Sequence, residues 1–118
     1  MIKRLRGCGA GCEYVAITPE GDIYPCHQFV GNEDYKLGSL YDGTFDQELS
    51  GRFAGLNIYT REECRDCWAR FYCSGGCSAP NLLVNGDIKK PHRVGCELER
   101  KRLECAIALR AIAAGMAE

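Results

Sequence analysis

The stretch from Cys64 to Cys77 reads Cys-Arg-Asp-Cys-Trp-Ala-Arg-Phe-Tyr-Cys-Ser-Gly-Gly-Cys. Its cysteines are spaced C-x2-C-x5-C-x3-C, and a C-x2-C pair brings two sulfur atoms onto one tight turn, where both can bind one metal centre. Four more cysteines flank this stretch, namely Cys8, Cys12, Cys26 and Cys96. Because a four-coordinate centre takes about four thiolates, the eight cysteines predict two metal sites.

The composition agrees with a small domain that depends on bound metal for much of its order. The chain has 118 residues, of which nine are cysteine and fourteen are glycine, so its apolar core is modest. A net charge of −1 gives no basic surface for nucleic acid, and no apolar run is long enough for a membrane span. The basic start, Met1 to Arg6, lacks the apolar segment of a signal peptide. We therefore expect a cytoplasmic, reducing environment, in which thiolates bind metals instead of forming disulfides.

The N-terminal part predicts a β-hairpin. The segments 14–18 and 22–24 favour strands, and Thr18-Pro19-Glu20-Gly21 between them has the chemistry of a tight turn. This hairpin delivers Cys26 at its end. The following segment, from Val30 to Gly43, is predicted to be irregular.

Three short helices are predicted in the middle of the chain. From Thr44, apolar residues recur at helical spacing over about three turns, at Phe45, Leu49, Phe53 and Leu56. Thr60 and Glu63 fit a capping box at the start of a helical turn that enters Cys64. Residues 80–84 predict a brief helix that ends at Asn85-Gly86.

The C-terminal part predicts a long amphipathic helix over residues 97–117. Its apolar positions recur at spacings of seven, four, three and four, at Leu98, Cys105, Leu109, Ile112 and Met116. The ninth cysteine, Cys105, lies on this stripe, and we interpret it as a core residue. The predicted fold is thus α+β: a small metal-organised domain with an N-terminal hairpin, short helices and a long last helix.

The cysteines divide naturally into two ligand sets. Cys64, Cys67 and Cys73 are close enough in sequence to share one site, with Cys96 as its fourth ligand. Cys77 is then the crossover ligand, which joins Cys8, Cys12 and Cys26 in the other site. Two-cluster ferredoxins have the same arrangement, since the fourth cysteine of a dense run binds the other cluster. Zinc also binds four thiolates at such spacings, so the metal stays open between zinc and iron–sulfur clusters.

One order of cysteines runs through residues 8–96: Cys8-x12-Gly21-x4-Cys26, then Cys64-x2-Cys67-x5-Cys73-x3-Cys77, then Cys96. In this order the chain resembles the SPASM domains, which extend radical S-adenosylmethionine (SAM) enzymes that modify peptides and proteins. The segment from Cys8 to Gly31 is similar in more detail to maturases of the six-cysteine ranthipeptides (SCIFF peptides), which form thioether cross-links.

The resemblance implies two auxiliary [4Fe-4S] clusters in a cluster-binding core at 8–96, with 97–117 as the last helix. Position by position, Cys26 and Cys77 match the first cluster, completed by Cys8, Cys12 or both. The second cluster matches Cys64, Cys67, Cys73 and Cys96. If Cys12 is not a ligand, the first cluster has an open iron for a substrate thiol. The implied partners are a radical SAM catalytic domain and a cysteine-rich precursor peptide.

The motif that binds the SAM-cleaving cluster, C-x3-C-x2-C, is missing, since Cys8-x3-Cys12 is followed by Glu-Tyr-Val. We therefore expect an accessory domain without catalytic residues of its own, cut from a longer enzyme, with SAM bound only by an absent barrel. The first alternative is a two-zinc module for structure or protein interaction. The second is a free-standing electron carrier like a two-cluster ferredoxin.

Several residues near the cysteines allow a functional and a plain interpretation. His27 is either a metal ligand, a hydrogen-bond donor to a cluster sulfur, or an ordinary surface histidine. We interpret His92 as an ordinary loop residue. We expect the aromatic residues between Cys67 and Cys73 to shield a cluster from water: Trp68, Phe71 and Tyr72. The glycines at 7, 9 and 11 are expected to let the backbone approach a cluster.

Overall fold

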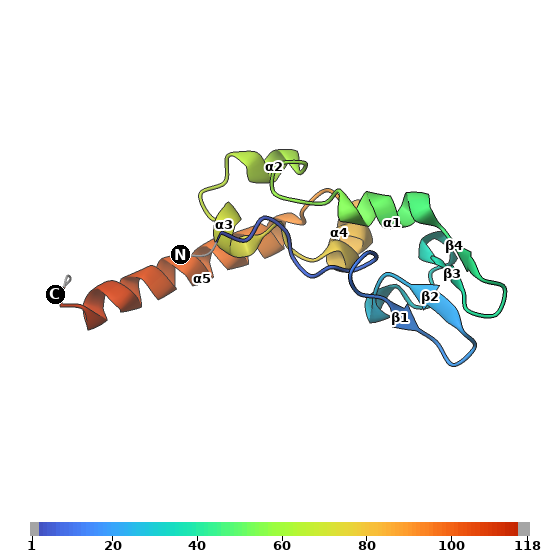
Figure 1. The fold of residues 1–118 in the computed structure, drawn as a ribbon. Coiled ribbons are helices and arrows are strands. Elements are labelled where there is room, and N and C mark those ends of the chain that lie inside the picture. Colours follow the sequence, from blue (N-terminus) through green and yellow to red (C-terminus); the bar gives the residue numbers. More distant parts are fainter. Residues whose placement is uncertain (1–2, 116–118) are drawn as a thin grey trace.

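The computed structural model describes residues 3–115 and shows an elongated molecule of 63 × 26 × 22 Å. A four-stranded antiparallel sheet and helix α1 (Gln47–Ala54) lie at one end, and helix α5 (Arg93–Ala113) extends from the other (Figure 1). Three short helices lie between them. The α+β class is confirmed. Among the described residues, no helix is both long and apolar enough to cross a membrane.

The predicted hairpin is confirmed. Strand β1 (Ala16–Ile17) pairs antiparallel with β2 (Asp22–Tyr24), and Ile17 lies opposite Ile23. Gly21 ends the turn with a φ of +82°, a left-handed conformation that glycine adopts without steric cost. The hairpin thus places Cys26 two residues after the end of β2.

The segment predicted to be irregular contains regular structure. Strand β3 (Gly38–Ser39) pairs with β2 on one side and with β4 (Thr44–Phe45) on the other. The short 3₁₀ helices η1 (His27–Phe29) and η2 (Glu33–Tyr35) precede it. Two-residue strands carry no measurable periodicity, so only the pairing with β2 reveals them.

Helix α1 is shorter than predicted. The side chain of Asp46 accepts a hydrogen bond from the Leu49 backbone N–H at 2.9 Å, and this N-cap fixes the helix start at Gln47. Phe45 consequently belongs to β4, and Leu56 lies beyond the helix end. Of the four predicted apolar positions, Leu49 and Phe53 are helical and buried.

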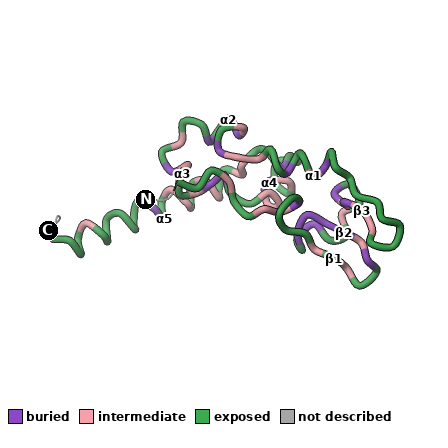
Figure 2. The backbone as a smooth tube through the Cα atoms, in the orientation of Figure 1, coloured by how far each residue is buried: buried purple, intermediate pink, exposed green. Residues whose placement is uncertain are grey.

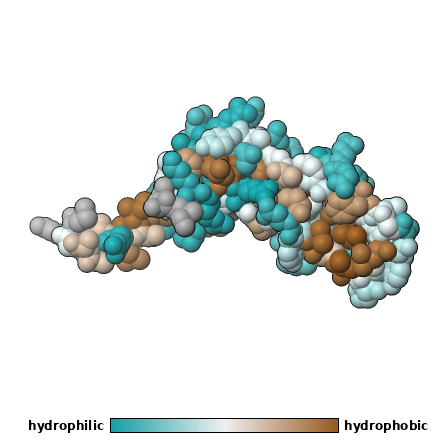
Figure 3. Space-filling model, viewed as in Figure 1, coloured by the Kyte–Doolittle hydropathy of each residue, from teal (hydrophilic) through white to brown (hydrophobic). Residues whose placement is uncertain are grey.

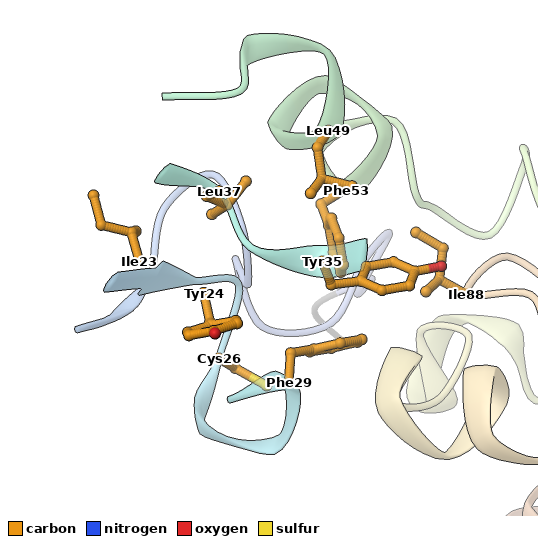
Figure 4. Close-up of a cluster of buried hydrophobic side chains, with 9 residues drawn as sticks. All are labelled: Ile23, Tyr24, Cys26, Phe29, Tyr35, Leu37, Leu49, Phe53 and Ile88. Carbon is orange, nitrogen blue, oxygen red and sulfur yellow. The ribbon is translucent and has the colours of Figure 1, made fainter. Parts of the chain in front are cut away.

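The hydrophobic core lies at the sheet end of the molecule, between the sheet, η1 and α1 (Figures 2 and 4). Phe29, Tyr35 and Phe53 form its aromatic centre, with ring centroids 5.1–6.1 Å apart. The other members are Ile23, Tyr24, Cys26, Leu37, Leu49 and Ile88. Hydrophobic surface is also exposed over β1 and β2 (Figure 3).

The short central helices are α2 (Glu62–Arg65), α3 (Arg70–Cys73) and α4 (Ser78–Asn85). The predicted capping box is wrong: Arg61 is the N-cap of α2 without a side-chain bond, and the Thr60 hydroxyl donates to the Gly55 carbonyl at 2.7 Å. The predicted stop after α4 is confirmed, because Gly86 is the left-handed C-cap.

Helix α5 begins four residues earlier than predicted, since His92 acts as its N-cap and its Nδ1 accepts from the Gly95 N–H at 3.5 Å. Its buried residue is Leu103, while the predicted apolar stripe is exposed in this chain at Leu98, Leu109 and Ile112. Cys105 is exposed too, so its interpretation as a core residue is wrong. The predicted end of the helix at 116–117, with Met116, lies outside the described residues.

Candidate metal centres

Each of the eight cysteines lies at the edge of a short element or in a loop. Cys64 is in α2, Cys73 ends α3, Cys77 is the N-cap of α4, and Cys96 is in the first turn of α5. Cys67 follows α2, and its N–H bonds to the Cys64 carbonyl at 3.2 Å, which closes the turn expected of a C-x2-C pair. Tight turns and helix ends leave these sulfur atoms accessible to a common ligand.

The three remaining cysteines lie at the N-terminal side. Cys26 is the N-cap of η1, and Cys8 and Cys12 are in the loop before the hairpin. This loop is anchored to the sheet end by two bonds of Gly11, whose N–H donates to Pro25 and whose carbonyl accepts from Ser50. A Cβ on Gly11 would stand 2.8 Å from the Phe53 side chain, so this glycine approaches the core and not a cluster, contrary to our expectation.

A first cavity of about 390 Å³ brings the N-terminal cysteines together with the end of the central run. Its cysteines are Cys8, Cys12, Cys26, Cys73 and Cys77. The amide of Gln28 lies 3.6 Å from the Cys77 sulfur. The Cys12 thiol, by contrast, donates to the Gly9 carbonyl at 3.6 Å and lies 3.8 Å from a guanidinium nitrogen of Arg6. His27 also lines this cavity.

A second cavity, again of about 390 Å³, lies among α2, α3, α4 and the start of α5. Its cysteines are Cys64, Cys67, Cys73, Cys77 and Cys96. The guanidinium of Arg100 lies 3.9 Å from the Cys67 sulfur. The structure thus gathers each predicted ligand set around one cavity, while Cys73 and Cys77 line both, and it leaves Cys105 outside both.

Three consecutive left-handed residues turn the chain between Cys73 and Cys77. Ser74 lines the first cavity, Gly75 lines the second, and Gly76 lines both. Ser74, Gly75 and Gly76 have φ values of +60°, +97° and +77°. Ser74 is the single non-glycine residue with positive φ among residues 3–115. This turn sets the positions of Cys73 and Cys77, the two cysteines that line both cavities.

Burial makes several of these thiols poor acids in the absence of a cation. It raises the pKa of Cys64 to about 11, with the thiolates of Cys73, Cys96 and Cys67 adding to the effect and Arg61 opposing it. Burial also raises the pKa of Cys96 and of Cys26. For Cys26 the charges of Cys77 and Cys8 add to the rise. Such thiols become ligands when a metal displaces their protons.

Unpartnered buried donors surround the two cavities. Within residues 3–115, the buried side-chain nitrogens without a hydrogen-bond partner are Arg61 Nε, Arg70 Nε and Asn81 Nδ2. Arg61 lines the first cavity, and Arg70 and Asn81 line the second. Buried donors are normally paired, so these nitrogens favour a ligand that accepts hydrogen bonds. Thiolate-ligated iron–sulfur clusters present such acceptors, and the residues fit this group.

The two cavities are large compared with a single bound ion. In the described part of the chain, no three His, Cys, Asp or Glu side chains lie close enough to hold one metal ion. Each cavity is about ten times the volume that a water molecule occupies in the liquid, roughly 30 Å³. Each cavity therefore has room for a group larger than one ion.

Four residues around the sulfur atoms were not found from the sequence: Gln28, Arg61, Asn81 and Arg100. The sequence spacing could have indicated two of them. Asn81 follows Cys77 by four residues and Arg100 follows Cys96 by four, so each residue lies on the same helix face as a cysteine. No sequence pattern indicated Arg61, since only the tertiary fold buries it. His92, expected to be a loop residue, lines the second cavity and caps α5.

The aromatic residues of the central run do not act together as a shield. Tyr72 lines the second cavity, but Trp68 and Phe71 line neither cavity, and Trp68 is 49% exposed. Phe71 instead lies between the cations of Lys3 and Arg70, 4.8 and 4.6 Å from its ring centre. The shielding prediction is wrong for these two residues.

Comparison with known families agrees with this site. The iron-sulfur cluster-binding domain family named SPASM matches residues 8–68, just over half of the chain. This chain is therefore a cluster-binding domain, and it belongs to the SPASM family.

Among curated proteins, an uncharacterized protein of Archaeoglobus fulgidus is 32% identical over 98 residues, 80% of this chain. The PqqA peptide cyclase of Xanthomonas axonopodis pv. citri is 31% identical over 67% of the chain. The serine-type anaerobic sulfatase-maturating enzyme of Klebsiella aerogenes is 28% identical over 61%. These matches span 23%, 22% and 18% of the respective relatives, so the chain corresponds to less than a quarter of their length.

Proposed function

We propose that this chain is the auxiliary cluster domain of a radical SAM enzyme that installs thioether cross-links in a cysteine-rich peptide. Two of the relatives are named for peptide cyclisation and for enzyme maturation, which supports a role in modifying a peptide or protein. The resemblance of residues 8–31 to ranthipeptide maturases supports the thioether chemistry. The catalytic barrel that cleaves SAM is then a further part of the enzyme.

The observation that carries the proposal is the gathering of eight thiols around two cavities. The ligands of a four-iron cluster each bind a different iron, so their sulfur atoms surround a volume instead of converging on one point. We assign Cys64, Cys67, Cys73 and Cys96 to the second cluster. Cys8, Cys26 and Cys77 hold the first, because all three line the first cavity.

Cys12 is the candidate for a cysteine that lies beside the first cluster without binding it. Its thiol already has the Gly9 carbonyl as a partner, and a guanidinium nitrogen of Arg6 lies 3.8 Å from its sulfur. Three protein ligands leave a position for a fourth. The thiol of the peptide substrate is the ligand that thioether formation requires at that position.

Thioether formation replaces a C–H and an S–H bond by one C–S bond. The hydrogen atom would leave to the 5′-deoxyadenosyl radical that the catalytic barrel makes from SAM, the electron to a cluster and the thiol proton to solvent. When bound, the clusters supply one-electron redox chemistry and an iron that acidifies a thiol. The residues of this chain hold and orient the peptide thiol at the mouth of the first cavity. Arg6 lines that cavity, and its guanidinium pairs with the Glu13 carboxylate and lies 3.8 Å from the Cys12 sulfur.

Iron, acid-labile sulfide and zinc are measured per chain on protein purified without oxygen. We expect about eight irons and eight sulfides, which is two four-iron clusters. About two zincs without sulfide, in protein made with iron available, would contradict the proposal and establish a structural zinc module.

A further inference from the structure

We propose that Asn81 and Arg100 donate N–H hydrogen bonds to the sulfur atoms of the cofactor in the second cavity and thereby raise its reduction potential. This inference rests on the proposed function, because it takes an iron–sulfur cluster as the group bound there. Neither residue is a ligand, and both act on the cluster through its sulfur atoms.

Asn81 is a buried donor that lacks an acceptor. It lies on α4, is 2% exposed and lines the second cavity. Its Oδ1 accepts from the His92 backbone N–H at 3.0 Å, and since only the oxygen of an amide accepts, this bond fixes which atom is the nitrogen. The nitrogen, Nδ2, has no hydrogen-bond partner. Burial of an unpaired N–H is unfavourable, so a sulfur acceptor in the cavity satisfies it.

Arg100 already contacts a ligand sulfur. Its Nη1 lies 3.9 Å from the Cys67 Sγ, the range of N–H···S contacts, which are longer than those to oxygen. It stands on α5 one turn after Cys96, so the helix that carries one ligand also directs the cation toward another. The first turns of α5 are held by the His92 cap, which is the same residue that Asn81 binds.

Donors and a cation next to the sulfur atoms favour the reduced cluster. Reduction adds one negative charge, which spreads onto the sulfur atoms, and hydrogen bonds to these sulfurs are one of the determinants of cluster potential. The cavity is lined by side chains of α2, α3, α4 and α5, among which such interactions are less screened than in water. Asn81 and Arg100 approach from two different helices, so their effects are separable by mutation.

The effect of Asn81 and Arg100 on the reduction potential is tested by potentiometric titration followed by electron paramagnetic resonance, on the anaerobically purified, cluster-loaded chain. Arg100→Gln removes the cation. Asn81→Asp keeps the oxygen that binds His92 but removes the N–H, and Asn81→Leu removes the N–H without adding a charge. The matched control is Arg102→Gln, since Arg102 also lines the second cavity on α5 and loses the same charge, but it pairs with Glu99 and contacts no sulfur.

We expect one of the two cluster potentials to fall in Arg100→Gln and in both Asn81 variants, with the other potential unchanged. At a fixed solution potential, the ratio of oxidised to reduced cluster should rise about tenfold, which is about 59 mV for a one-electron couple. The shifted potential should be the one retained in a Cys8→Ala background, where only the second cavity keeps all its ligands.

The inference is overturned if Arg100→Gln and Asn81→Leu shift neither potential beyond the Arg102→Gln control, or if both cluster potentials shift alike. It is also overturned if Asn81→Asp alone has an effect, because the added charge then explains it. Iron and sulfide analysis of each sample separates the two proposals. Loaded clusters with unchanged potentials contradict only this inference, whereas protein without iron and sulfide contradicts the proposed function.

Discussion

Gly75 packs directly against the buried side chain of Arg61, and a Cβ atom at position 75 would stand 2.8 Å from both Cδ and Nε of Arg61. Gly75 belongs to the left-handed turn between Cys73 and Cys77, and Arg61 lines the first cavity. Arg61 donates from Nη1 to the carbonyls of Ile88 and Lys89 at 2.9 and 2.8 Å. This contact thus ties the turn between Cys73 and Cys77 to the segment before α5.

Gly75→Ala should destabilise the protein and weaken cluster binding. An alanine at a φ of +97° is strained by roughly 1–3 kcal/mol, and the new methyl group must also displace Arg61. We expect a lower midpoint of thermal unfolding without oxygen and less iron per chain. Gly43→Ala is the control, because Gly43 has a φ of +70° with open space around it. An equal effect of both substitutions would mean that the contact with Arg61 is unimportant.

Arg61→Met should lower the free energy of unfolding through its lost hydrogen bonds. The buried carbonyl of Ile88 left without a donor costs about 1–3 kcal/mol, and the partly buried carbonyl of Lys89 also loses its donor. The comparison is Arg65→Met, since Arg65 also donates to a carbonyl, that of Tyr59 at 2.7 Å, but at an exposed position where water replaces it. We expect Arg65→Met to cost less than about 1 kcal/mol. Denaturant unfolding of the two variants under the same conditions gives the difference.

Cys96→Ala should lower the iron content below about eight per chain, because the second cluster then keeps only three of the four thiolates that we assign to it. Cys105→Ala should leave about eight irons, since Cys105 is exposed on α5 and lines neither cavity. Both positions lie on the same helix, which makes them a matched pair. Loss of iron in Cys105→Ala, or full iron in Cys96→Ala, would contradict the assignment of ligands.

Cys12→Ala should retain both clusters, whereas Cys26→Ala should lose the first. The reason is that the Cys12 thiol is exposed and bonded to the Gly9 carbonyl, while Cys26 is buried beside the thiols of Cys77 and Cys8. Iron analysis gives the cluster count. The electron paramagnetic resonance spectrum of Cys12→Ala with and without an added small thiol then tests for the open iron. A Cys12→Ala protein with only about four irons would make Cys12 the fourth ligand.

The elements that were predicted well are those whose signal is local. The hairpin follows from Pro19 and Gly21 between two β-prone runs, and the stop after α4 follows from Gly86, because backbone sterics act within a few residues. The elements that were missed depend on distant partners. Strand β3 exists because β2 pairs with it, and the apolar stripe of α5 lies exposed although its spacing is typical of a packed helix.

The sequence by itself determined which cysteines can share a metal centre, because cysteine spacing is a covalent property and sets which sulfurs share a turn. Only the tertiary structure decided what surrounds those sulfurs. It placed Cys73 and Cys77 between two cavities, buried Arg61 and Asn81 beside them, and left Cys105 on the surface. Burial and the direction of hydrogen bonds depend on segments far apart in the chain, and no local pattern carries them.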